Sequence, residues 1–557
     1  MKNKKTYIGT NFGHGSAACA LNYQGLLTFA VEEDRIVKEK NTSRFPYNGI
    51  NLILESDFVE DTIVWSEGWN IYKRFFLKGL LHSLQYFGDR NYYEMRLLKE
   101  WERMKQGYSG YSRYGTFNYI GHHASHAYSL IPFGLPKNSL IFISDTIGEF
   151  ESISFFYWDG KMRLINRISH PNSFGSVFHQ FAYHLGFKGR TGPGKLMALS
   201  GYGKPIWLEN LNEISIVKKT DFEIFQYKYP SHRLKDAPDI FINKCNDTNL
   251  KLALIDSKNN YQKGKDIAAS IQAWFTYNSW KLIEQNIIFA RNNLKLKVDH
   301  IGFAGGAALN CQANEYFIKW LMKCDIGSVT ISPWSEDSGT AIGAAVCSFI
   351  KANQGIEIPK AGAFLGPKVI NQGKISNDLE NDIKIAVEAI LQGKLIALAS
   401  GRLEFGPRAL GGRCIIGNAF DLESKNKLNR CKNRPEFMPF APAILEEDFD
   451  LLYYGNGSVN MAWTVKARLI AIDLIPSAIH ITGGSRVQIV KSDNSLLYKL
   501  LICIKAKMGV GVVLLTSLNS SDETIPIYYN DVKVTSEKMK LHGILHDNGW
   551  ENINIKG

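Results

Sequence analysis

Apolar runs broken by polar turns mark the first part of the chain. Residues 7–10, 16–21 and 26–31 are largely apolar, with a polar turn and Gly25 between them, so the pattern predicts three strands joined by two turns. Residues 139–168 repeat this layout around Gly148 and an Asp-Gly pair that is typical of a tight hairpin. The repetition predicts two related halves, in which each first hairpin points a polar turn at a shared cleft.

A helical stretch separates this region from a later strand. Residues 265–294 are rich in helix-forming positions, and residues 300–304 form a short apolar strand. The strand runs into Gly305 and Gly306, and a helix is expected from about residue 308. A strand, glycines and a helix N-terminus in this order favour the binding of an anion.

The apolar periodicity stops at residues 351–368, where glycine and proline cluster. We therefore expect two domains, residues 1–358 and residues 359–557. The second domain is expected to be mixed α/β, with a helix at 383–392, a strand at 395–399 and further strands at 479–490 and 510–515.

Composition limits the possible classes of protein. With 557 residues, 45% of them hydrophobic, the chain can bury large cores. Its apolar runs are far shorter than the roughly 18 residues of a membrane-spanning helix, and no signal-peptide core follows the basic start, so we expect a cytoplasmic protein without a membrane partner. Eight cysteines stand singly, which argues against a disulfide framework and thiolate zinc sites. The net charge of +12 would suit nucleic acid or anionic metabolites, but basic residues mostly alternate with acidic ones, so anionic small substrates explain the excess at least as well and no nucleic-acid partner is expected.

Two histidines and two acidic residues are candidates for a metal site. His122 and His126 are four residues apart, so on a helix they share one face and can hold one cation, although packing or capping a helix would explain them equally well. Two carboxylates shift the balance, because Asp145 ends the strand of the second hairpin and Asp337 lies in a polar turn before a helix of small residues. Imidazoles with carboxylates suit iron, manganese or zinc better than calcium.

Other candidates for chemistry are spread along the chain. His14 lies in the first hairpin turn, where a neutral imidazole can take a proton from a hydroxyl, and a structural role is equally consistent. Residues 401–413 hold three arginines among glycines, an arrangement expected where a polyphosphate is gripped; an exposed basic loop is the less favoured alternative. Further donors of the phosphate-binding kind are Lys432, Arg434, Arg486, Ser517 and Asn519.

Six motifs, in a fixed order, carry a resemblance to a known family. They are Gly-His-Gly-Ser-Ala-Ala, Val-Glu-Glu-Asp-Arg with Phe-Pro, His-His-Ala-Ser-His-Ala, Gly-Lys-Leu-Met-Ala-Leu-Ser-Gly-Tyr-Gly, Ala-Gly-Gly-Ala-Ala-Leu-Asn and Glu-Phe-Gly-Pro-Arg-Ala-Leu-Gly-Gly-Arg. Over residues 7–527 the chain resembles the O-carbamoyltransferases of antibiotic and nodulation-factor biosynthesis.

The resemblance implies an α/β protein with two unlike domains. Residues 1–358 would form an actin-like ATPase domain of two ribonuclease-H-like halves, similar to the tRNA threonylcarbamoyl transferases, and residues 359–557 a YrdC-like domain. The YrdC-like domain would make carbamoyladenylate from carbamoyl phosphate and ATP, with magnesium bound to the ATP. The N-terminal domain would pass the carbamoyl group to a hydroxyl of a small-molecule natural product.

The same resemblance assigns roles to residues. His122, His126, Asp145 and Asp337 match the family's iron(II) ligands, and His14 matches its candidate base. The implied contacts to nucleotide and carbamoyl phosphate are Arg408, Arg413, Lys432, Arg434, Arg486, Ser517 and Asn519, with Lys432 and Arg486 also catalytic. The implied nucleotide contacts of the N-terminal domain are Gly305, Gly306, Asn310 and Lys195.

The sequence departs from the family pattern at five places, one of which is residues 515–519, where Leu-Thr-Ser-Leu-Asn replaces the usual Asn-Thr-Ser-Phe-Asn. Gly15 stands where an acidic or amide residue is usual, Cys414 replaces a serine, and Met438 replaces an arginine. At Gly483, the run Thr-Gly-Gly-Ser-Arg lacks the usual acidic residue.

Two other functions are considered beside carbamoyl transfer. The duplicated hairpins and the Ala-Gly-Gly element would also suit an actin-like ATPase or small-molecule kinase, and the positive charge a tRNA-modification-related protein that binds RNA. Aromatic residues crowd residues 65–114 and could wall an acceptor pocket, although helix core is favoured for most of them. The acceptor and the oligomeric state, a homodimer included, stay open.

Overall fold

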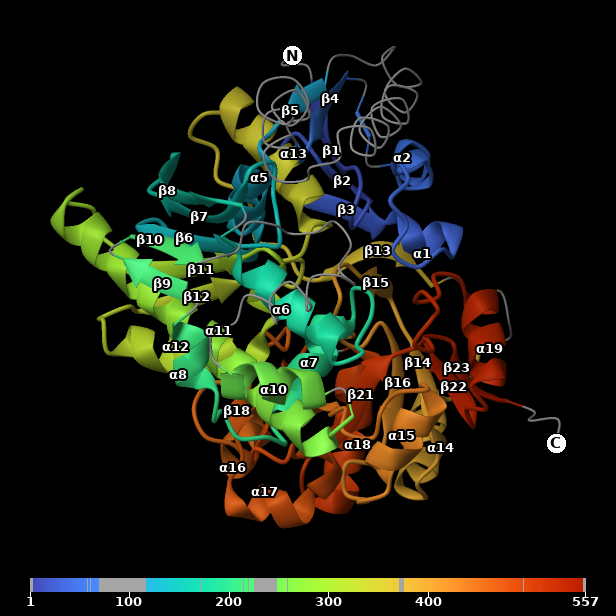
Figure 1. Ribbon diagram of the computed structural model, residues 1–557. Coiled ribbons are helices and arrows are strands. Elements are labelled where there is room, and N and C mark those ends of the chain that lie inside the picture. The colour runs from blue at the N-terminus through green and yellow to red at the C-terminus, as the bar shows by residue number, and fades with distance from the viewer. Residues whose placement is uncertain are drawn as a thin grey trace. The chain divides into compact units, whose positions relative to one another are not determined.

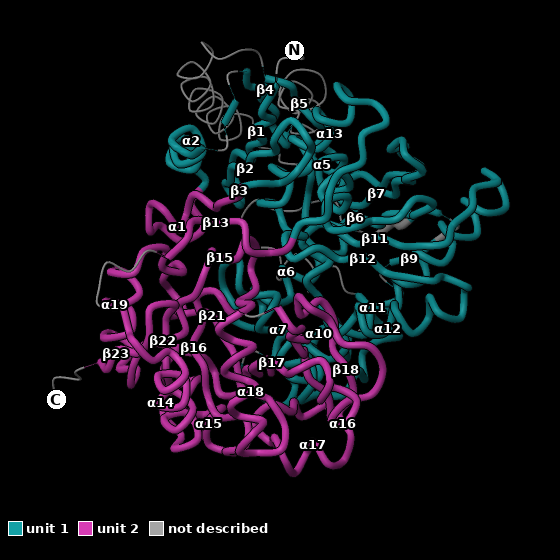
Figure 2. Tube along the Cα trace, turned by 180° about the vertical axis from the view of Figure 1, so that it is seen from behind, with its two compact units in different colours: residues 1–28, 43–361 teal, residues 29–42, 362–557 magenta. Residues whose placement is uncertain are grey.

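The computed structural model describes residues 4–57, 59–60, 62–69, 117–170, 172–213, 215–218, 220–224, 248–257, 259–369, 375–493 and 495–553 (Figure 1). The chain forms two compact units, and Figure 2 colours them separately. Unit 1 holds residues 1–28 and 43–361, and unit 2 holds residues 29–42 and 362–557. A short piece of the N-terminal sequence therefore folds with the C-terminal part of the chain.

Two five-stranded sheets carry the same strand order. The first runs β3-β2-β1-β4-β5 and the second β8-β7-β6-β11-β12. In the first sheet β1 is antiparallel to β2 and parallel to β4, and β4 is parallel to β5. In the second sheet β6 is antiparallel to β7 and parallel to β11, and β11 is parallel to β12. The strands are β1 (Lys5–Asn11), β2 (Ala17–Leu21), β3 (Leu27–Glu32), β4 (Thr62–Glu67), β5 (Phe117–Tyr119), β6 (Ser139–Ser144), β7 (Glu151–Trp158), β8 (Met162–Ser169), β11 (His300–Ala304) and β12 (Ser328–Ile331).

A crossing of two helices in unit 1 sets the position of the histidines. α13 (Gly339–Ala352) packs on α5 (His122–Ser129) and on β1. The backbones approach so closely that a Cβ on Gly343 would lie 1.7 Å from the carbonyl oxygen of Ser125. Because only glycine fits such a contact, the small residues of α13 let the helix that carries the histidines lie directly against the one that follows Asp337.

The remaining helices of unit 1 include one long helix with a clear start. In α11 (Tyr261–Asn292) the side chain of Asn260 accepts a hydrogen bond from the backbone of Lys263, which caps the helix. β9 (Ser215–Lys218) and β10 (Asp221–Ile224) form a separate antiparallel pair. The other helices are α2 (Tyr47–Leu54), α6 (Phe174–His184), α7 (Gly192–Ser200), α8 (Leu208–Asn212), α10 (Thr248–Ser257) and α12 (Cys311–Met322).

Unit 2 is built on a seven-stranded sheet of order β20-β17-β21-β16-β14-β22-β23, with apolar clusters that include strand and helix residues. Its strands are β14 (Ile396–Ala399), β16 (Arg413–Gly417), β17 (Ala441–Leu445), β20 (Gln488–Val490), β21 (Val512–Ser517), β22 (Gly543–His546) and β23 (Gly549–Asn552). Smaller pairs join β13 (Phe364–Lys368) to β15 (Arg402–Glu404) and β18 (Val465–Lys466) to β19 (Gly484–Ser485). The helices are α1 (Glu33–Val37), α14 (Leu379–Leu391), α15 (Ser424–Cys431), α16 (Phe449–Leu452), α17 (Leu469–Leu474), α18 (Leu496–Met508) and α19 (Tyr529–Lys538).

The local predictions agree with these elements in most places. The strand at 300–304, the helix at 265–294 and the helix at 383–392 are confirmed within a few residues. The single strand expected at 479–490 was wrong: the chain turns at Gly483, where φ is +78°, and only two short strands form. The fold is mixed α/β, as expected.

Two further expectations concerned the cysteines and membrane-spanning helices. The seven cysteines within the described ranges are free thiols. No described helix is long and apolar enough to cross a membrane.

Candidate functional site

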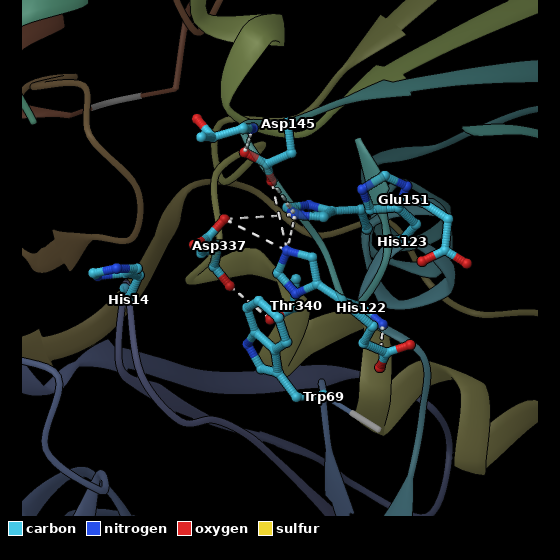
Figure 3. A network of polar contacts seen from close by, with 12 residues as sticks. His14, Trp69, His122, His123, Asp145, Glu151, Asp337 and Thr340 are labelled. Atoms are coloured by element: carbon cyan, nitrogen blue, oxygen red, sulfur yellow. Dashed lines mark hydrogen bonds and ion pairs between the residues drawn. The ribbon is translucent and has the colours of Figure 1, made fainter. Parts of the chain in front are cut away.

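Four side chains from three parts of unit 1 converge on one point (Figure 3). His122 and His126 lie one turn apart on α5 and are buried, Asp145 follows β6, and Asp337 precedes α13. Their ligand atoms all lie within 4.8 Å of one another. The structure thus brings together the four residues that the sequence analysis placed at a metal.

The geometry of these four residues suits a transition metal. The two Nε2 atoms are 3.2 Å apart, and the Asp145 Oδ2 lies 3.5 Å from that of His122 and 3.3 Å from that of His126. Asp337 Oδ1 is 3.7 Å from both. Ligands bound at about 2.1 Å in a tetrahedron are separated by roughly 3.4 Å, so these spacings fit one central ion. The donor set, two imidazoles and two carboxylates, is that of iron, manganese or zinc sites.

The electrostatics agree with a place prepared for positive charge. Burial lowers the pKa of His126, but hydrogen bonds and charge from Asp145 and Asp337 outweigh burial and raise it to about 9. Burial raises the pKa of Asp145, yet the two histidines hold it well below its usual value. The raised pKa of His126 means that the two carboxylates favour positive charge at this point, and a metal bound there would compete with protons.

Two neighbours support His122 and were not identified as site residues from the sequence. The backbone N–H of His122 donates to the Glu149 carboxylate at 3.2 Å, which satisfies the start of α5. The indole of Trp69 stacks on the His122 imidazole with ring centroids 3.8 Å apart. Trp69 belongs to the aromatic segment 65–114, for which helix core was the favoured interpretation. The aromatic residues of that segment from 70 to 114 lie outside the described residues.

His14 lies in the turn between β1 and β2, and in the view of Figure 3 Asp337 is between His14 and the imidazole of His122. The neighbouring Gly15 has a φ of +66°, and a Cβ there would lie 2.8 Å from the backbone nitrogen of Ser338. The glycine that departs from the family pattern therefore lets this turn lie against the loop that carries Asp337.

The four predicted nucleotide contacts of the N-terminal domain differ in their surroundings. A Cβ on Gly306 would lie 3.3 Å from Asp145 Oδ1, so this glycine borders the metal cluster, and Gly305 precedes it with φ of +85°. Asn310 caps α12 by accepting from the backbone of Ala313 and exchanges hydrogen bonds with Gln272. Its amide is thus engaged within the protein. Lys195 lies in the first turn of α7, apart from these contacts.

Unit 2 contains a buried lysine surrounded by oxygen atoms. The ammonium of Lys432 donates to the backbone and side-chain oxygens of Ser517 and Asn519, and the residue is fully buried. Burial, followed by the charge of Arg434, holds the pKa of Lys432 well below its usual value. Three of the phosphate-binding candidates therefore meet at the ends of α15 and β21.

Further cations lie near this lysine. Burial and then the charge of Arg486 lower the pKa of Arg434 to about 10, and the Nε of Arg486 is buried without a hydrogen bond. Within the described ranges neither arginine forms an ion pair. Lys40, from the N-terminal segment of unit 2, is also depressed in pKa by burial and then by Arg434. Lys40 has Asp34, Asp522 and Glu523 near it, which act in the opposite direction on its pKa. The two partly buried arginines have no such ion pair within the described ranges, as expected where an anionic ligand supplies the missing charge.

The arginine-rich loop is less uniform than its sequence indicates. Arg413 is fully buried, and its guanidinium donates to the backbone carbonyls of Ser400, Gly401 and Ile527. It therefore holds the backbone together, whereas Arg408 lies partly exposed in the loop before β16.

The arginine-rich loop is fixed by buried charges. The carboxylate of Glu404 accepts hydrogen bonds from the backbone of Leu410, Gly412 and Arg413. Arg35 of the N-terminal segment donates to the carbonyls of Glu404 and Gly406, and Glu32 accepts from the N–H of Gly406. The segment 29–42 is in this way tied to the loop that presents Arg408.

The remaining departures lie in ordered surroundings. The carbonyl of Met438 accepts a hydrogen bond from Asn429. Cys414 is buried beside Glu404, and the pKa of its thiol is raised mainly by burial and further by the charge of Glu404. The backbone N–H of Gly483 donates to the carbonyl of His480 in the turn described above.

Comparisons with known proteins agree with the resemblance seen in the sequence. Residues 6–346 match the model of the carbamoyltransferase N-terminus and residues 387–550 that of the carbamoyltransferase C-terminus. An uncharacterized protein of Methanocaldococcus jannaschii is 30% identical over 72% of this chain and 68% of its own length. The nodulation protein NolNO of Sinorhizobium fredii is 25% identical over 97% of this chain and 79% of its own. The match to a crystal structure of full-length HypF in the phosphate- and nucleotide-bound form covers 64% of this chain and 56% of that one, at 12% identity and a TM-score of 0.34.

Proposed function

The chain belongs to the carbamoyltransferase family, and we propose that it transfers a carbamoyl group, activated with ATP, to a hydroxyl of a small-molecule natural product. The observation that carries this proposal is the pairing of two unlike sites in one chain. One is a cluster of imidazoles and carboxylates in unit 1, and the other is a group of cations around the buried Lys432 in unit 2.

The cations of unit 2 support an activation step. Water would first cleave carbamoyl phosphate into carbamate and inorganic phosphate. The carbamate oxygen would then attack the α-phosphorus of ATP, and the bond from that phosphorus to pyrophosphate would break, which gives carbamoyladenylate. Carbamoyl phosphate and ATP both carry phosphate, and magnesium accompanies the ATP. Lys432, Arg434, Arg486 and Arg408 would neutralise the phosphate oxygens, and Ser517 and Asn519 orient the lysine. Arg413 contributes by holding the loop, because its guanidinium is engaged by carbonyls.

The cluster of unit 1 supports the transfer step. The acceptor oxygen would attack the carbamoyl carbon, the bond from that carbon to AMP would break, and His14 would take the hydroxyl proton. His122, His126, Asp145 and Asp337 would hold a divalent metal, for which we propose iron(II). A metal held there would supply positive charge that stabilises the leaving adenylate. Gly305 and Gly306 would let the nucleotide approach the backbone beside Asp145, with Lys195 as a further cation.

The architecture supports the same assignment. The repeated strand order of the two sheets is what two ribonuclease-H-like halves of an actin-like ATPase domain require, and we assign unit 1 to that class. We assign the mixed sheet of unit 2 to the YrdC-like class. The family membership favours carbamoyl transfer over the kinase, ATPase and tRNA-modification alternatives, since neither of the two matched family models describes a phosphotransferase.

A labelled-substrate experiment tests the proposal. The metal-loaded protein is given ¹³C-carbamoyl phosphate, ATP and a panel of sugar, macrolide and alkaloid alcohols, and products are read by mass spectrometry. We expect an O-carbamoyl product with at least one class and AMP in equal amount. His126→Ala should abolish this product while pyrophosphate release persists. A panel without product, or AMP formation independent of carbamoyl phosphate, would contradict the proposal.

A further inference from the structure

The orientation of the His122 ring has an unusual support. A histidine that binds a metal through Nε2 normally donates its Nδ1–H to a carboxylate or carbonyl, which fixes the ring and its tautomer. The Nδ1 of His122 is buried and has no hydrogen-bond partner among the described residues. A different contact must therefore hold the imidazole in the plane that points Nε2 at the cluster.

Trp69 provides that contact. Its indole lies over the imidazole at 3.8 Å between centroids and 28° between planes, and only 6% of the residue is exposed (Figure 3). A flat ring stacked on one face blocks rotation of the imidazole, and its π-electrons favour positive charge on the imidazole when a cation is bound.

Asn11 holds the indole in turn. The Nε1–H of Trp69 donates to Asn11 Oδ1 at 2.7 Å, and Asn11 is fully buried. The amide nitrogen of Asn11 donates to the carbonyls of His14 at 2.7 Å and Gly15 at 2.9 Å. One side chain thus fixes both the tryptophan and the turn that carries His14.

The topology explains why these residues meet. Asn11 ends β1, and Trp69 follows the end of β4, which is the parallel neighbour of β1. Functional side chains of parallel strands gather where the strands end, because neighbouring ends open on the same side of the sheet.

We propose that Trp69 is a positioning residue of the metal centre, and that Asn11 couples Trp69 to the turn that carries His14. The metal ligand His122 and the proposed base His14 would in this way keep a fixed separation. The inference rests on the metal site of the proposed function. Replacing an outer-shell partner of a ligand typically weakens metal affinity by about 10–100-fold, and we expect this range for Trp69→Leu.

The test uses cobalt(II) alone as the probe, without substrate. Dissociation constants are measured by calorimetry on metal-free full-length protein, and the visible absorption of the cobalt complex at saturation reports its coordination geometry. We expect Trp69→Leu to bind more weakly and with an altered spectrum, and Trp69→Phe to recover most of both properties. Trp280→Phe, in an aromatic pair with Trp320 on other helices, is the matched control and should behave as wild type.

The outcomes separate this inference from the proposed function. If the wild type binds no cobalt(II), or if His126→Ala binds it equally well, the metal site itself is wrong. If the wild type binds and Trp69→Leu matches it in affinity and spectrum, only the role of Trp69 is wrong. Should Trp69→Leu fail to fold, Trp69→Phe decides: the fluorescence change on adding cobalt(II) must shrink relative to Trp280→Phe, and an unchanged signal would overturn the inference.

Discussion

Replacing Arg434 by methionine should stabilise the ligand-free protein and weaken its binding of ATP. The pKa of this guanidinium falls from 12.5 to about 10, first through burial and then through Arg486. At about 1.4 kcal/mol per tenfold change, the charged side chain destabilises the fold by roughly 3 kcal/mol. Methionine fills similar space without the charge, and about 2–4 °C per kcal/mol for a domain of this size gives a rise of several degrees in the melting temperature of unit 2.

The same substitution should have the opposite effect on the ligand complex. A hydrogen bond to a charged group contributes roughly 1.5–3 kcal/mol, so loss of the guanidinium should raise the Kd for ATP by about 10–100-fold. The assay is thermal unfolding in phosphate-free buffer, with and without ATP, together with calorimetric titration. A variant that melts lower than wild type without ATP, or that binds ATP equally well, would refute the reasoning.

Arg413 is the matched control for that experiment. Arg413 is fully buried and Arg434 partly buried, and burial lowers the pKa of both, but the guanidinium of Arg413 is engaged by backbone carbonyls. Arg413→Met would remove the guanidinium donor of the Ser400 and Ile527 carbonyls, at about 1–3 kcal/mol for each. We expect a lower melting temperature with and without ATP, in contrast to Arg434→Met.

Three other predictions follow from single contacts. The pKa of Lys432 is well below 10.5, through burial and then Arg434, so the unfolded chain binds more protons than the folded one. Stability of the ligand-free protein should therefore rise with pH from that lowered pKa up to 10.5, and urea titrations should show a flatter profile in Lys432→Met. Gly15→Ala should lower the melting temperature by an amount equivalent to about 1–3 kcal/mol and weaken cobalt(II) binding, because φ is +66° and the Cβ meets Ser338; unchanged values for both would contradict this. Glu404→Ala should destabilise by roughly 3 kcal/mol or more, since it leaves buried N–H donors of Leu410, Gly412 and Arg413 unpaired; urea unfolding with an unchanged midpoint would count against it.

The metal cluster was accessible to sequence reasoning because its signals are local. The spacing of His122 and His126 fixes their common helix face, and Asp145 and Asp337 stand where a strand ends and a helix begins. Such positions follow from periodicity and turn residues alone. The strands and the long helices follow from the same patterns.

Other residues depend on contacts that no local pattern carries. The sequence did not distinguish Trp69 from a core residue, because its stacking on His122 depends on two strand ends that meet only in the folded protein. Lys40 belongs to unit 2 because the segment 29–42 folds with the C-terminal part of the chain. Arg413 and Asn310 have the residue types of ligand contacts, yet tertiary burial engages their side chains with the protein itself. Residue type predicts the possible chemistry, and tertiary contacts decide which groups are available for it.

The most direct measurement is pyrophosphate release by the full-length, metal-loaded protein given ATP and carbamoyl phosphate without any acceptor. The two-site account predicts release that depends on carbamoyl phosphate, is lost in Arg486→Met and persists in His126→Ala. Release that is equal without carbamoyl phosphate, or that survives in Arg486→Met, would contradict carbamoyladenylate formation at the cations of unit 2.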